Sequence, residues 1–214
     1  MKEVTVKTIE LRRPEMGELA DIYSIETELR IARDYCLEAE QLRMDDKREA
    51  LIVDALVMAA VVRYTRCFQP TGKRISLTRD DLSGLSGQLQ KWHQYFKDIR
   101  DKHIAHSINV YEQSYVRAAL TSENGTRQSF TVLLPGNERV VFSNKNAAAL
   151  HELIDAVLKV AFQKRRDAEQ AALGILNSLP EDVIQSFDPR QPMNVGPKDV
   201  IKARQDRINV KKQG

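Results

Sequence analysis

Hydrophobic residues recur at three- and four-residue steps through most of this 214-residue chain, a spacing typical of amphipathic helices. The pattern predicts a first helix at about 22–44, a second at about 47–68, a third at about 83–106 and a fourth at about 143–176. Ser178-Leu-Pro-Glu181 has the residue order of a capping box with an early proline, which predicts a short last helix over 180–187. The chain is therefore expected to be mainly helical.

The second predicted helix is apolar on nearly every side between Leu51 and Val62. Helices of that kind are normally surrounded by other helices, so we expect it at the centre of an antiparallel bundle. Asp54 interrupts the apolar run, and a carboxylate in such a place needs a partner, which we expect to be one of the arginines.

The hydrophobic pattern changes after Asn109, where three segments rich in β-branched and aromatic residues are separated by turn signals. Asn124-Gly125 is a strong signal for a tight turn between strands. We therefore expect a small antiparallel hairpin or meander inserted at about 112–142. The expected fold class is an antiparallel helix bundle, with four long helices, a short C-terminal helix and this β insertion.

One domain over residues 1–187 accounts for all of these elements. From residue 188 to 214, prolines and charges replace the apolar pattern, so a basic, flexible C-terminal tail is expected. The net charge of +3 permits an anionic partner without requiring one. The N-terminus has no hydrophobic signal region, and no apolar run approaches the roughly 20 residues of a membrane helix. We therefore expect a cytoplasmic protein that does not enter a membrane, with two buried, reduced thiols at Cys36 and Cys67.

The third predicted helix carries an apolar stripe that alternates four- and three-residue steps, the spacing of a seam between packed helices. His103 and His106 continue that stripe. Arg100 lies six residues before His106, and in a straight α-helix the two side chains would point about 120° apart. Either the helix ends or bends between them, or Arg100 of one chain and His106 of another form one site.

The segment Arg100-Asp-Lys-His-Ile-Ala-His106 resembles the Arg-x(4–6)-His motif of the HEPN superfamily. The surrounding residues 98–107 are similar to the abortive-infection branch, where Arg-Asp/Asn-Lys-x-x-Ala-His is typical. The resemblance covers roughly residues 20–175. It implies a homodimer whose two motifs face each other across a composite cleft. It also implies a metal-independent endoribonuclease that acts on RNA as a toxin or antiphage-defence effector, with a cognate antitoxin or regulatory protein as a further partner.

One departure concerns control of the activity. A subset of the superfamily has a tyrosine two residues after the motif histidine, which a partner nucleotidyltransferase modifies. This chain has Ile108 there, so that route of neutralisation is not expected.

The residue types of the motif suit RNA cleavage without a metal. Histidine alone has an unperturbed pKa near neutrality, so His106 is the candidate general acid or base. Arg100 is the candidate clamp for the charged phosphorane, because its guanidinium offers donors in a fixed fork. Asp101 is the candidate orienting group for either one. We expect no cofactor and no metal, because neither a cysteine nor a patterned carboxylate completes a site with His103 and His106.

Two alternatives remain open from the sequence. In the first, the chain is a non-catalytic HEPN-like module that binds RNA, a nucleotide or a partner protein. In the second, it is a helical assembly factor in which the motif serves only for packing. His93 and His151 are isolated in the pattern and receive no expected role. Thr71-Gly-Lys-Arg74 lacks the spacing of a phosphate-binding loop, so an exposed basic turn is expected there.

Overall fold

The computed structural model describes residues 16–70, 75–104, 112–123, 127–139 and 141–185. This part of the chain is mainly helical, as the hydrophobic periodicity predicts. Its α-helices are α1 (Gly17–Gln41), α2 (Lys47–Arg66), α3 (Gly87–Ile99), α4 (Asn144–Asn177) and α5 (Glu181–Gln185). Single helical turns flank α3, a 3-10 turn η2 (Asp80–Leu82) before it and a π turn η3 (Arg100–Ile104) after it. The predicted C-terminal tail and the position of His106 lie outside the described residues.

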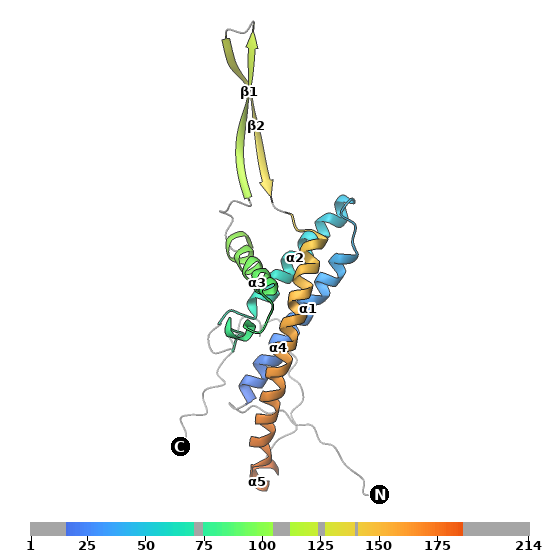
Figure 1. The fold of residues 1–214 in the computed structure, drawn as a ribbon, viewed down its shortest axis with the longest axis vertical. Coiled ribbons are helices and arrows are strands. Elements are labelled where there is room, and N and C mark those ends of the chain that lie inside the picture. Colours follow the sequence, from blue (N-terminus) through green and yellow to red (C-terminus); the bar gives the residue numbers. More distant parts are fainter. Residues whose placement is uncertain (1–15, 71–74, 105–111, 124–126, 140, 186–214) are drawn as a thin grey trace.

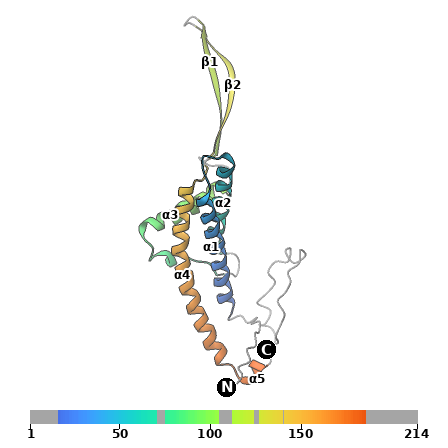
Figure 2. The ribbon, with the colours of Figure 1, turned by 90° about the vertical axis from the view of Figure 1, so that its right-hand side faces the viewer.

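Three long helices form the centre of the molecule, with α1 antiparallel to α2 and α4 (Figures 1 and 2). Their apolar stripes meet in one core, which α3 joins from the side. The side chains without exposed surface at this contact include Leu29 and Cys36 of α1, Val53 and Val57 of α2, and Leu153 of α4. Removal of apolar surface from water, at roughly 25 cal/mol per Å², is the main stabilising contribution here.

Polar side chains fix where the long helices begin. The Asp46 carboxylate accepts hydrogen bonds from the backbone N–H groups of Arg48 and Glu49, at 2.8 and 2.9 Å, and so caps α2. At the start of α4, the Asn144 carboxamide donates to the carbonyl oxygens of Ala39 and Leu42, at 3.0 and 2.8 Å. These bonds tie the first turn of α4 to the last turn of α1.

The described hydrogen-bond donor to Asp54 is a backbone group, whereas an arginine was expected. Oδ1 of Asp54 accepts a hydrogen bond from the backbone N–H of Phe142 at 3.0 Å, and both residues are buried. The bond connects the middle of α2 to the segment that leads into α4.

α2 is less enclosed than its composition predicts. Val53 and Val57 are buried, but Leu51 is 62% exposed and Ile52 is 38% exposed. The buried side chains of α2 form one stripe between Val53 and Thr65, and the opposite side of the helix stays open within the described part of the chain.

Between η3 and α4 the chain forms two strands, β1 (Glu112–Glu123) and β2 (Arg127–Arg139). They pair antiparallel from Glu112 opposite Arg139 to Glu123 opposite Arg127, with a register shift between Ala119 and Leu120. Both views show this ribbon projecting away from the helices (Figures 1 and 2). None of the helices in the described part is both long enough and apolar enough to span a membrane.

Candidate functional site

The candidate motif begins where α3 ends. Ser86 caps α3, since its Oγ accepts a hydrogen bond from the Leu89 backbone N–H at 3.3 Å. Phe96 and Ile99, in the second half of the helix, are buried in the core of the same chain, and Trp92 is partly buried against it. The apolar stripe of α3 is therefore buried against the core of its own chain. The residues after Ile99 lie at the edge of that core.

The α-helix stops at Ile99, and Arg100–Ile104 form one π turn, η3. The third helix was predicted to continue in α form to about residue 106. Side-chain periodicity shows which positions are apolar, but it does not reveal a change from i+4 to i+5 backbone hydrogen bonding. π turns are rare and occur frequently at functional sites. The helix geometry thus changes at Arg100, the first residue of the motif.

Two side chains hold the Arg100 guanidinium. Its Nη1 donates to Oδ1 of Asp101 at 2.9 Å. The Gln69 carboxamide, with its oxygen turned toward the guanidinium, accepts from Nη1 and Nη2 at 2.8 and 3.0 Å. These contacts use three of the five N–H groups of the guanidinium.

The remaining two N–H groups of Arg100 lie on one edge, formed by Nε and the second hydrogen of Nη2. This edge makes no hydrogen bond to the residues that the structure describes, and the Arg100 side chain is 30% exposed. An edge of this kind is the fork with which arginine binds two oxygens of a phosphate or carboxylate.

The nearby acidic residues are each engaged by a partner. Asp98 accepts a hydrogen bond from Gln94 Nε2 at 3.1 Å, and its carboxylate lies 3.7 Å from Lys102 Nζ. Asp101 is engaged by Arg100 itself. Among the described residues, neither carboxylate makes a hydrogen bond to the open edge of the guanidinium.

The structure brings together two of the three predicted site residues, Arg100 and Asp101. His106 lies in 105–111, outside the described residues, and the structure describes only the backbone of His103. Gln69 is the residue that the sequence did not indicate. It lies just after α2, 31 residues from Arg100, and meets it only because η3 packs against α2.

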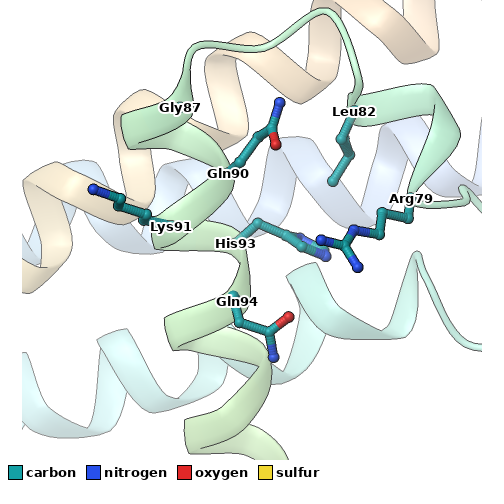
Figure 3. Close-up of a pocket in the computed structure, with 7 residues that line it drawn as sticks. All are labelled: Arg79, Leu82, Gly87, Gln90, Lys91, His93 and Gln94. Atoms are coloured by element: carbon teal, nitrogen blue, oxygen red, sulfur yellow. The ribbon is translucent and has the colours of Figure 1, made fainter.

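A concave feature lies apart from Arg100, between η2 and α3 (Figure 3). It is a pocket of about 340 Å³, lined by Arg79, Leu82, Gly87, Gln90, Lys91, His93 and Gln94. His93, which had no expected role, is one of its walls, and its Nδ1 lies 2.8 Å from the hydroxyl of Tyr64. Burial lowers the pKa of His93, and the positive charges of Lys97 and Arg79 lower it further.

His151 is a contact between helices. Its Nδ1 lies 3.0 Å from Glu40 of α1, and its Nε2 lies 3.4 Å from Asp155, which also pairs with Arg33. This network joins α1 to α4. Across the described ranges, no group of three or more His, Cys, Asp or Glu side chains is arranged to hold a metal ion.

No family model matches the chain, and neither a curated protein nor a solved structure matches it. The likeness to HEPN domains rests on the motif at residues 100–106.

Proposed function

We propose that this protein is a metal-independent endoribonuclease of HEPN type that acts as a toxin or antiphage-defence effector. The observation that supports the proposal is the Arg100 guanidinium at the start of a π turn. Gln69 and Asp101 hold one end of it, and its other edge makes no hydrogen bond to a described residue. A guanidinium fixed in this way is a pre-organised clamp for a phosphate.

In the proposed reaction, the 2′-hydroxyl of RNA attacks the adjacent phosphate and the 5′-oxygen of the next nucleotide leaves. Arg100 binds two of the phosphate oxygens through Nε–H and Nη2–H and stabilises the charge that develops on them. His106 transfers the proton, as general base to the 2′-hydroxyl or as general acid to the leaving oxygen. Asp101 orients Arg100 through the 2.9 Å bond and takes no proton.

The proposal includes a homodimer with a composite site. Ile99 is 2% exposed, so the apolar stripe of α3 is already buried within its own protomer. A second copy would therefore meet the solvent side of η3, where Asp101 and Lys102 lie. In that arrangement Arg100 of one protomer and His106 of the other face the same phosphate.

The alternative is a non-catalytic module that binds RNA, a nucleotide or a partner protein through the same clamp. The open edge of Arg100 favours it equally, because a fork that binds a phosphate needs no chemistry to do so. The two functions differ in their need for His106, since only the nuclease requires a proton-transferring group.

RNA cleavage in excess EDTA separates these functions. We expect the wild-type protein to fragment total cellular RNA, and His106→Ala to reduce the rate by about 100-fold or more. Arg100→Gln should do the same, whereas Arg48→Gln, an exposed position at the start of α2, should not. RNA that stays intact with the wild-type protein but still binds it would favour the non-catalytic module. Equal cleavage by the wild-type protein and both site variants would rule out this site.

A further inference from the structure

We propose that the pocket between η2 and α3 binds a small phosphorylated polyol, such as a pentose phosphate. This site is separate from the one around Arg100, and its residues are not part of the HEPN-like motif.

The ionisable residues that line the pocket are all basic. They are Arg79, Lys91 and His93, and no Asp or Glu is among the residues that line it. Figure 3 shows the Arg79 guanidinium and the His93 ring pointing toward each other across the pocket, with Lys91 directed to the other side of α3. A nearby carboxylate, Asp81, is engaged elsewhere, because it lies 2.7 Å from Lys164. The Arg79 guanidinium is therefore the positive charge that faces the pocket, and it attracts anions.

Tyr64 determines which nitrogen of His93 carries the proton. Tyr64 has no exposed surface, and burial raises its pKa well above the usual value, so its hydroxyl stays protonated. The Tyr64 hydroxyl lies 2.8 Å from Nδ1 of His93, and we infer that the hydroxyl donates to this nitrogen. The ring proton is therefore on Nε2. Since the pKa of His93 is lowered, the imidazole is neutral at pH 7 and offers Nε2–H as a donor.

These donors suit a phosphate better than a carboxylate. The Arg79 fork binds two oxygens, and the His93 N–H gives a third donor from a different direction. A phosphate monoester has three terminal oxygens to accept all of them, and a carboxylate has two. Gly87 adds the positive end of the 13-residue helix α3, which also favours phosphate.

The other walls of the pocket suit hydroxyl groups. Gln90 uses its Nε2 to donate to the Leu85 carbonyl at 3.0 Å, and Gln94 uses its Nε2 to donate to Asp98 at 3.1 Å. Each carboxamide therefore has its oxygen left as an acceptor, which suits a hydroxyl. The volume of about 340 Å³ is at the lower end of the range for small-ligand pockets, about 300–1,000 Å³. One phosphate and a short hydroxylated body fit this description.

Isothermal titration calorimetry with the full chain tests the site, with ribose 5-phosphate, ribose and inorganic phosphate as the three probes. We expect ribose 5-phosphate to bind more tightly than either of the others. Arg79→Gln should weaken its binding about tenfold or more, because a charged hydrogen-bond donor is lost. Arg79 is exposed, so this variant should fold. Arg48→Gln is the matched control and should bind as the wild-type protein does.

Nitrogen NMR of the histidine rings is a second test of whether the ligand binds at His93. Ribose 5-phosphate should shift the Nε2 signal of His93 and leave the signals of His151 unchanged. Absence of saturable binding, or binding that Arg100→Gln abolishes and Arg79→Gln does not, would overturn the proposal. Equal affinity for inorganic phosphate and ribose 5-phosphate would overturn the polyol assignment. Loss of RNA cleavage in Arg100→Gln with unchanged sugar-phosphate binding would show that the two sites are independent.

Discussion

Among single residues, Arg100 combines a partner that is adjacent in sequence with one that is distant in sequence. Asp101 holds it from the next position in sequence, and Gln69 holds it from the end of α2. Adjacent residues of opposite charge are visible in the sequence, so the pairing of Arg100 with Asp101 was within reach of prediction. The contact with Gln69 was not, because it exists only when η3 packs against α2.

His93 makes stability depend on pH. Its pKa is lowered by burial, and then by Lys97 and Arg79, so the unfolded chain binds the proton more strongly than the folded one. The stability that His93 contributes is present above its unfolded pKa of about 6.5 and is lost as pH falls through the folded value. Urea unfolding at pH 7.5 and 5.5 should show a larger loss for the wild-type protein than for His93→Phe. An equal loss in the two proteins would contradict this reading.

Cys36 should be chemically inert in the folded protein. Burial and the negative charge of Glu40 raise the pKa of its thiol to about 12, and Cys67 is also buried. Because the thiolate is the reactive form, an aromatic disulfide reagent at pH 8 should label neither cysteine until urea unfolds the chain. Rapid labelling of one thiol without denaturant would show that the core opens easily there.

Among the elements, the helices were the most predictable feature and their ends the least. The stripes of α1 and α4 follow directly from i, i+3 and i+4 apolar positions, which packing then buries. The π turn after α3 was not predictable, because the apolar stripe continues in sequence through His103 and His106. The openness of α2 was not predictable either, since composition alone does not give the number of neighbouring helices.

Two leucines of α4 test where the core ends along this 34-residue helix. Leu150 has no exposed surface and Leu173 is 56% exposed. Leu150→Ala should lower the free energy of unfolding by about 2–5 kcal/mol, because it leaves a cavity. Leu173→Ala should change it by no more than about 0.5 kcal/mol. Urea titrations measure both values, and similar losses at the two sites would mean that the second half of α4 is covered.

The ribbon of β1 and β2 should be dispensable for folding of the helices. Two-stranded ribbons are marginally stable on their own, and this one projects away from the core. A chain with residues 112–139 replaced by a short glycine-rich turn should therefore melt within a few degrees of the wild-type protein. Phe142→Ala is the control just beyond the ribbon. Its side chain is buried in the core, so its loss should cost about 3–5 kcal/mol. Loss of cooperative unfolding in the shortened chain would show that the ribbon supports the bundle.

In the whole molecule, a core of three long helices carries α3 on one side, and the turn η3 follows at the edge of that core. The ribbon leaves the bundle beyond the same edge (Figure 1). Arg100 lies at this edge of the core, and its side chain is 30% exposed. The predicted class, a mainly helical chain, agrees with the structure, whereas the dimer is part of the proposed function.

Mixing two inactive variants tests the composite site most directly. Arg100→Gln and His106→Ala are purified separately, allowed to exchange subunits, and assayed for RNA cleavage in EDTA. If Arg100 of one protomer works with His106 of the other, each mixed dimer has one intact site of two. Random exchange should then restore about a quarter of wild-type activity. Activity that stays at the level of the separate variants, in a mixture shown to contain mixed dimers, would contradict a site shared between two chains.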